Sequence, residues 1–311
     1  MKKKKIILLG YNGSIGNVIF KKLLKKNIQI FCVGRNKKKS FFSNVKYVNW
    51  DFLDFSQSKL HFLNNADIII NCTGEINNNK LNLKQINLFF VRKLINYIIK
   101  LKKPIRLFQL SSVSVYGASK KYLFKKKTIN ENCKESPNDL YSDTKLDADN
   151  FIKQRSKLAK NKFSYTIFRI TNVIGHKKIS NIFKSIIFLL KRGIWIKYSY
   201  NTKYHFIHVN DVANAIIISL MNLETSKNQT YIVSDDSNQY ELHKAYANFY
   251  KKKLIILTLP IILIKFFILF FPLPKKILNF FLVFSSQISY ENKKLKKSLG
   301  YNPKYSLRNE L

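Results

Sequence analysis

Three residues of this sequence have the types and spacing for acid–base chemistry on a hydroxyl or a ketone. Tyr141 and Lys145 lie four positions apart in Tyr-Ser-Asp-Thr-Lys, and Ser112 lies upstream in the segment Ser111–Gly117. On a helix, side chains four positions apart share one face, so the phenol and the ammonium group project into the same space. A nearby cation stabilises the phenolate and lowers the phenol pKa from about 10 toward neutrality. We therefore expect Tyr141 to be a general acid or base that is tuned by Lys145.

A glycine-rich turn near the N-terminus predicts a site for a pyrophosphate. The turn follows an apolar strand predicted over Lys5–Leu9 and precedes a helix predicted to begin at about Ser14. Glycines at such a turn let a pyrophosphate approach the backbone N–H groups of the helix N-terminus. The chain has only nine glycines, so three at GxxGxxG spacing in this place predict a dinucleotide site. Its candidate residues are Gly10, Gly13, Ser14, Ile15 and Gly16.

The residue after the second predicted strand distinguishes two dinucleotides. That strand covers Gln29–Val33 and is followed by Gly34-Arg35-Asn36-Lys37. An NAD site usually places an acid here for the ribose 2′-hydroxyl, whereas an arginine accommodates the 2′-phosphate of NADP. Arg35 therefore favours NADP(H), with NAD as the alternative.

Alternating apolar runs and amphipathic stretches predict how these residues are positioned. Further strands are predicted over Val45–Trp50, Asp67–Asn71, Arg106–Leu110 and Tyr165–Arg169, and further helices over Leu88–Ile99 and Lys145–Leu158. This alternation predicts an α/β fold, a Rossmann-type doubly wound parallel sheet. We expect residues 1–175 to form the dinucleotide-binding domain, with 205–235 returning to it. Residues 176–311 would form a smaller substrate-binding region with an apolar cap at 254–283.

Several further motifs occur in a fixed order along the chain. They are Asp51-Phe52, Cys72-Thr73-Gly74, Asn87, the R-x-x-N-x-x-G segment Arg169–Gly175, the block Phe206–Ala213 and the terminal element Leu295–Pro303. Together with the GxxGxxG turn and the YxxxK pair, this set resembles the extended short-chain dehydrogenase/reductase family, the NAD-dependent epimerases and dehydratases of nucleotide sugars. The resemblance covers nearly the whole chain.

The resemblance implies a role for individual residues. Tyr141 would be the acid or base, Lys145 would bind the nicotinamide ribose, and Ser112 would hydrogen-bond the oxygen at C4 of a sugar. Hydride would pass between that carbon and the nicotinamide ring. The remaining cofactor contacts would be Asp51 and Phe52 at the adenine, with Thr73 and Asn87 along the dinucleotide. Asn172 would face the nucleotide sugar.

Two departures from the family pattern narrow the expected reaction. Sugar-nucleotide dehydratases carry Thr-Asp-Glu where this chain has Ser112-Val113-Ser114, so the acid pair for elimination of water is missing. Many members place an arginine for the pyrophosphate of the substrate just before the block at Phe206. This chain has Tyr204 at that position, so we expect the neighbouring Lys203 to bind the substrate instead.

The leading hypothesis is an enzyme acting at C4 of a UDP-linked hexose in surface-polysaccharide synthesis, slightly favouring a 4-ketoreductase. A 4-epimerase of UDP-glucose or UDP-N-acetylglucosamine with tightly bound NAD is the alternative. A hydroxysteroid-type dehydrogenase shares the Tyr/Lys pair, and a non-catalytic nucleotide- or RNA-binding relative is the remaining alternative. The resemblance also implies a homodimer through the helices at Leu88–Ile99 and Lys145–Leu158.

The composition bears on partners and location. The formal net charge is +39, but the lysines are spread in short runs along the chain, so we expect no specific nucleic-acid partner. Three cysteines outside any CxxC pair, and no export signal, indicate a cytoplasmic protein. The histidines lack ligand spacing, so no metal is expected. Residues 254–274 predict two short apolar helices that cap a cleft or contact a membrane surface.

Overall fold

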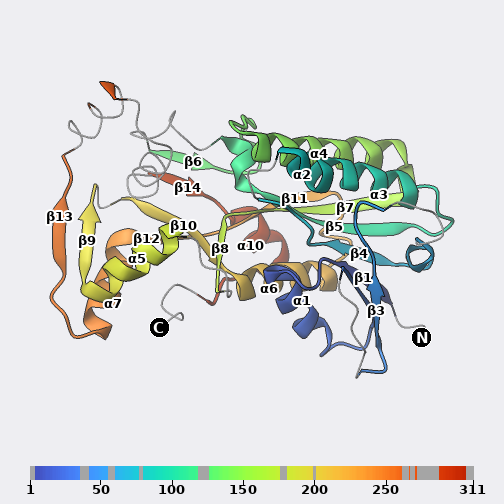
Figure 1. Ribbon diagram of the computed structural model, residues 1–311, viewed down its shortest axis with the longest axis horizontal. Coiled ribbons are helices and arrows are strands. Elements are labelled where there is room, and N and C mark those ends of the chain that lie inside the picture. The colour runs from blue at the N-terminus through green and yellow to red at the C-terminus, as the bar shows by residue number, and fades with distance from the viewer. Residues whose placement is uncertain are drawn as a thin grey trace.

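A parallel sheet of seven strands, in the order β3-β2-β1-β4-β5-β7-β11, forms the larger part of the structure (Figure 1). The computed structural model describes residues 4–35, 42–54, 60–76, 80–117, 126–175, 181–198, 201–260, 266, 270–271 and 287–305. The strands are β1 (Lys5–Leu9), β2 (Gln29–Gly34), β3 (Val45–Asn49), β4 (Ile68–Asn71), β5 (Ile105–Ser112), β7 (Phe163–Ile170) and β11 (Gln229–Val233). All neighbouring pairs are parallel. The predicted doubly wound α/β fold is therefore confirmed.

Helices cover both faces of this sheet and explain why its central strands are apolar throughout (Figure 1). One face packs against α1 (Ser14–Leu23), α6 (Val209–Met221) and α10 (Lys293–Leu299), with Ile19, Ile216 and Leu295 in the shared core. The opposite face packs against α3 (Phe90–Ile98) and α4 (Leu140–Leu158), with Leu94 and Ile152 fully buried. The short helix α2 (Lys80–Lys84) lies beside α4.

The helix with the Tyr/Lys pair begins earlier than the sequence predicts. It starts at Leu140 instead of Lys145, because Asp139 and Ser142 form a capping box. The Asp139 carboxylate accepts a hydrogen bond of 2.8 Å from the backbone N–H of Ser142. This cap fixes the turn that carries Tyr141.

Smaller elements complete the structure. A three-stranded sheet contains β8 (Asn172–Ile174), β10 (Lys203–His208) and β12 (Asp235–Asn238), and it packs with α5 (Asn181–Arg192) and α7 (Gln239–Phe249). Two strand pairs are β9 (Ile194–Lys197) with β13 (Ile255–Thr258), and β6 (Lys127–Ile129) with β14 (Ile288–Tyr290). We call β8, α5, β9, β10, β12, α7 and β13 the C-terminal lobe. Single turns of 3-10 helix lie at His61–Leu63, Val113–Tyr116 and Lys160–Lys162, and a π-helical turn lies at Gln85–Phe89.

The apolar segment 254–283 is described only at 254–260, 266 and 270–271. Where described continuously it is the strand β13 and not the helix that the sequence predicts, because Ile255–Thr258 pair with β9. No helix in the described ranges is long and apolar enough to cross a membrane. The boundary predicted at residue 175 stays a prediction, although β11, from the predicted returning segment, pairs with β7.

Candidate active site

Ser112, Tyr141 and Lys145 come together at the carboxyl edge of the large sheet. Ser112 ends β5, and Tyr141 lies in the first turn of α4. The Ser112 hydroxyl lies close enough to Tyr141 to act on its pKa, and the Lys145 Nζ lies 5.9 Å from the centre of the Tyr141 ring. The Ser112 Oγ also accepts a hydrogen bond of 3.1 Å from the N–H of Ser114, which fixes its rotamer. A carbonyl or hydroxyl oxygen bound here would meet two hydroxyl groups.

Burial changes the acidity of this group of residues. It raises the pKa of Tyr141, and the hydrogen bond from Ser112 opposes the rise only in part. It also lowers the pKa of Lys145 to about 8, although the carboxylate of Asp149 works against this. The expected lowering of the Tyr141 pKa is therefore wrong for this structure, because burial is the largest influence on the phenol and raises its pKa. Tyr141 is held in its protonated form.

Asn87 ties the loop after β4 to the helix that carries Tyr141 and Lys145. Its Oδ1 accepts from the N–H of Glu75 at 3.0 Å, and its Nδ2 donates to the carbonyl of Glu75 at 2.9 Å. Nδ2 also contacts the Oγ1 of Thr144 at 3.4 Å. Asn87 sits in the π-helical turn, a geometry that is frequent at functional sites. It therefore places a loop next to Lys145 and has both amide groups occupied.

The glycine turn is tightly packed and leads into a helix N-terminus without a side-chain cap. Gly10 has a φ of +76°, and a Cβ on it would lie 3.2 Å from the backbone of Cys72 and Thr73. A Cβ on Gly16 would lie 2.2 Å from the carbonyl oxygen of Gly10, so only glycine fits there. Helix α1 begins at Ser14 with no side-chain cap on its N-terminus. The uncapped N–H groups of that first turn, which includes Ile15, and the absence of side chains fit a pyrophosphate.

Further residues predicted to bind the cofactor follow neighbouring strands of the same edge. Arg35 comes directly after β2 and is exposed. Thr73 follows β4, and its N–H and hydroxyl both donate to the Asn71 Oδ1, at 3.1 and 2.6 Å. Gly74 lies where a Cβ would approach the Lys145 Nζ to 3.2 Å, so this loop runs beside the ammonium group.

Asp51 and Phe52 lie after β3. Asp51 is exposed and accepts from the N–H of Leu53 at 3.1 Å. The Phe52 ring packs at 5.4 Å from Trp50 and 5.3 Å from Phe90, measured between ring centres. Phe52 therefore has a packing role in addition to any contact with adenine.

The residues predicted to bind the substrate lie on the three-stranded sheet. Asn172 is exposed at the start of β8. The Lys203 Nζ donates to the Ser289 Oγ at 3.4 Å, toward β14. Tyr204, the next residue of the same strand, is fully buried and its hydroxyl lies 2.9 Å from the His243 Nε2. Because adjacent strand residues point to opposite faces, Tyr204 belongs to the core of the C-terminal lobe while Lys203 lies on the other face.

The block Phe206–Ala213 has a structural role. His208 caps α6 by accepting from the N–H of Asn210 at 3.1 Å. Buried Asp211 accepts from the backbone N–H groups of Lys304 and Tyr305, at 2.9 and 2.7 Å. The block therefore fastens the C-terminal segment to α6.

A buried ion network beneath the site is not assigned by the sequence analysis. The side chain of Arg169, at 0% exposure, forms ion pairs with Asp149 at 3.1 Å and with Glu135 at 2.9 Å. It also donates to the Tyr116 hydroxyl at 2.8 Å, and Ser111 donates to Asp149 at 2.9 Å. Ion pairing raises the pKa of Arg169 against the effect of burial. The available signal was the spacing of Asp149, one helical turn beyond Lys145.

Among the residues that the structure describes, no group of three or more His, Cys, Asp or Glu side chains could hold a metal ion. The site therefore offers a proton donor, a hydroxyl that can hold an oxygen, a lysine and a glycine-lined edge.

Several known structures share the fold of this chain. The UDP-glucuronic acid 4-epimerase of Bacillus cereus, in complex with NAD, matches with a TM-score of 0.71 at 15% identity over 98% of this chain and 93% of that chain. The UDP-Glc/GlcNAc 4-epimerase of Campylobacter jejuni matches with a TM-score of 0.71 at 17% identity over 97% and 95%. A short-chain dehydrogenase/reductase superfamily protein of Agrobacterium tumefaciens with bound NAD gives 0.72 at 13% over 98% and 94%. These similarities concern the fold.

Sequence comparison identifies the family of the chain. The bifunctional polymyxin resistance protein ArnA of Wigglesworthia glossinidia brevipalpis is 28% identical over 263 residues, which cover 77% of this chain. The matched region is 40% of the length of that relative. The family model described as the NAD dependent epimerase/dehydratase family matches residues 6–234. This match contains the glycine turn, Ser112, Tyr141 and Lys145, and the chain therefore belongs to the NAD-dependent epimerase/dehydratase family.

Proposed function

We propose that this chain transfers hydride at C4 of a UDP-linked hexose, as an NADP(H)-dependent 4-ketoreductase in surface-polysaccharide synthesis. The observation that carries the proposal is that Ser112 and Lys145 both lie close to Tyr141, at the sheet edge where the glycine turn lies. The substrate class is suggested by related folds, whose complexes contain UDP-glucuronic acid and UDP-glucose.

The chain's own groups would perform the proton steps of the reduction. Tyr141 would give its hydroxyl proton to the carbonyl oxygen at C4 while that carbon receives hydride, which leaves an alcohol and a tyrosinate. Ser112 would donate a hydrogen bond to the same oxygen and hold it in place. Lys145 would hold the nicotinamide ribose. Bound NADPH would supply the hydride.

The preference for NADP(H) rests on the residues after β2. Arg35 is exposed at the point where the strand ends, and the sequence 35–43 contains no Asp or Glu to accept a ribose 2′-hydroxyl. A guanidinium group there can pair with a 2′-phosphate.

A 4-epimerase with NAD is the second candidate. Its supporting observation is that two 4-epimerases of UDP sugars share this fold over 97–98% of the chain, one of them with NAD. In that reaction the same carbon is oxidised and then reduced on its other face, and no dinucleotide is consumed.

We further propose a homodimer through α3 and α4. Leu158, the last residue of α4, is 66% exposed, and Phe89, directly before α3, is 38% exposed. Sedimentation of the protein tests this part, and a monomer would contradict it.

Identifying the dinucleotide that the purified protein carries distinguishes a 4-ketoreductase from a 4-epimerase. The protein is dialysed and denatured, and the released nucleotides are separated and quantified. A reductase should emerge empty and then bind NADPH more tightly than NADH. Stoichiometric NAD that survives dialysis would identify the epimerase and overturn the interpretation of Arg35. Absence of binding to either dinucleotide would contradict both.

A further inference from the structure

The outer end of the C-terminal lobe combines exposed apolar side chains with lysines. We propose that this end docks on an anionic lipid bilayer. The outer face consists of Phe188 on α5, the strand β13 (Ile255–Thr258) and the run Lys251–Lys253 that precedes it. In Figure 1 β13 lies at the margin of the molecule opposite the large sheet.

The apolar part of the outer face is exposed along an entire strand. Phe188, Ile255, Ile256 and Leu257 are each between 40% and 52% exposed. Ile255 and Leu257 are opposite Ile194 and Ile196 of β9, so their side chains share one face of the strand pair. A folded protein rarely leaves several adjacent aliphatic residues this exposed without a binding role.

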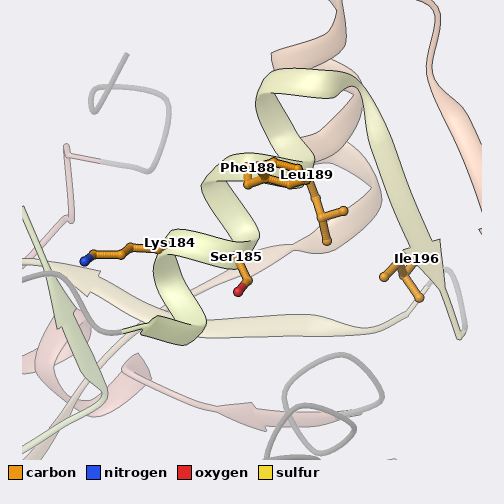
Figure 2. Close-up of a pocket in the computed structure, with 5 residues that line it drawn as sticks. All are labelled: Lys184, Ser185, Phe188, Leu189 and Ile196. Atoms are coloured by element: carbon orange, nitrogen blue, oxygen red, sulfur yellow. The ribbon is translucent and has the colours of Figure 1, made fainter.

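A hollow extends this apolar face toward α5. Figure 2 shows Phe188 and Leu189 on α5 and Ile196 on the neighbouring strand, with Ser185 and Lys184 along the helix. The hollow has a volume of about 370 Å³ and is lined chiefly by apolar atoms. None of the residues of the candidate active site lines it, so it is separate from the catalytic group.

Cations from two elements flank these apolar residues. Lys251, Lys252 and Lys253 are all exposed immediately before β13. Their backbone lies against the C-terminal end of α5, since a Cβ on Gly193 would be 3.0 Å from the carbonyl oxygen of Lys253. The guanidinium of Arg192 lies 3.6 Å from the centre of the Phe188 ring.

The elements of the outer face carry basic residues and no acidic ones. The segments 171–210 and 242–290, which contain α5, β9 and β13, have fourteen Lys and Arg residues and no Asp or Glu. The acids of the C-terminal lobe are Asp235, Asp236 and Glu241, which lie on β12 and α7. The positive charge beside the outer face is therefore not compensated from within its own elements, unlike the mixed charge along α4.

These properties fit an anionic lipid surface better than other occupants. Such a surface attracts lysines electrostatically and also accepts aliphatic side chains below the headgroups. A nucleic acid would offer phosphates but no apolar layer for Ile255 and Leu257. A second copy packed on the same face would bring the two Lys251–Lys253 runs together, and their repulsion opposes that pairing.

Co-sedimentation of the full chain with lipid vesicles tests the proposal. We expect binding to vesicles of phosphatidylcholine with phosphatidylglycerol, weaker binding as salt increases, and none to phosphatidylcholine alone. Each lysine removed near the bilayer should weaken binding about fivefold, so Lys251→Gln/Lys252→Gln/Lys253→Gln should weaken it about 100-fold. The variant Ile255→Ser/Leu257→Ser should also lose binding at low salt.

A matched control removes the same charge elsewhere. Lys21→Gln/Lys25→Gln/Lys26→Gln changes three exposed lysines in and after α1 and should bind nearly as the unchanged chain does. Equal loss in this control would show a general effect of net charge and overturn the proposal. Absence of vesicle binding, or binding of RNA that depends on the same lysines while lipid binding does not, would also overturn it.

Fold and self-association are measured on the same variants. Thermal unfolding and dinucleotide binding should match those of the unchanged chain, because no altered residue lies in the candidate active site. A change of oligomeric state in Ile255→Ser/Leu257→Ser would show that a second copy covers the face and would contradict lipid docking.

Discussion

The large-sheet half and the C-terminal lobe each bury a polar cluster, but the two clusters differ in charge and in what they support. In the first, Arg169 joins Asp149 on α4 to Glu135 and Tyr116. In the second, Tyr204 and His243 form a neutral pair that is closed to solvent.

The two clusters differ in whether they contact α4, the helix that carries Tyr141 and Lys145. Asp149 lies one turn beyond Lys145 on α4, so the charged network acts directly on the helix and on the lysine. The neutral pair packs β10 against α7. The buried charged network therefore supports the helix that carries Tyr141 and Lys145, whereas the buried neutral pair supports the packing of the C-terminal lobe.

The largest expected effect tests whether the first half is catalytic. Tyr141→Phe should lower kcat by about 10²–10⁴-fold, because the proton donor is lost, while the Kd for NADPH changes little. Steady-state rates and dinucleotide titration measure the two quantities. The control Tyr97→Phe removes another hydroxyl, one that donates to Asn64 at 2.9 Å, and should leave kcat unchanged. Rates near those of the unchanged chain in Tyr141→Phe would refute the mechanism.

The charged network should matter more for stability than exposed ion pairs do. Arg169→Met leaves Asp149 buried without its cation and should lower the free energy of unfolding by about 3–5 kcal/mol. The control Lys227→Met breaks a pair of 3.9 Å in which both side chains are at least half exposed, and should cost below about 1 kcal/mol. Urea unfolding compares the two. Similar losses would show that Arg169 is not the support described.

The neutral cluster should be the acid-sensitive one. Burial lowers the pKa of His243 to about 4, whereas an unfolded histidine titrates near 6.5. Between these values the unfolded chain binds a proton that the folded chain does not, so stability falls as pH falls from about 6.5 to 4. The expected loss is roughly 3 kcal/mol across this window.

Urea unfolding at pH 7 and pH 4.5 checks this effect. His243→Gln should lose less stability on acidification than the unchanged chain does. The control His61→Gln, on an exposed residue, should behave as the unchanged chain. If all three lose the same amount, His243 is not responsible.

The smallest expected effect concerns dinucleotide choice. Arg35→Ala should weaken NADPH binding about tenfold and leave NADH binding unchanged, because one charge-assisted contact to the 2′-phosphate is lost. Fluorescence titration with both dinucleotides measures this. Arg192→Ala removes the same side chain from the C-terminal lobe and should change neither. A parallel loss for NADH and NADPH in Arg35→Ala would remove the argument for NADP(H).

The sequence predicted the large sheet well because its strands are apolar and its turns carry glycine. The predicted ends of six of its strands lie within about two residues of the observed ends. Ser112, Tyr141 and Lys145 lie close together, as the sequence predicts. The start of α4 was misplaced, because the capping box at Asp139 precedes any apolar periodicity.

Tertiary contacts explain what the sequence could not predict. The pKa of Tyr141 depends on burial, which no spacing reports. Ile255–Thr258 reads as part of an apolar helix, yet pairing with β9 makes it a strand. The network around Arg169 joins residues that are up to 53 positions apart.

Transfer of isotope to the sugar tests the central claim most directly. The protein is incubated with a UDP-linked 4-keto hexose and NADPH that carries deuterium at C4 of the nicotinamide ring. Mass spectrometry and NMR of the sugar then locate the label. The account predicts deuterium at C4 of the hexose with the unchanged chain and none with Tyr141→Phe. Failure to bind either dinucleotide, or transfer that persists undiminished in Tyr141→Phe, would contradict it.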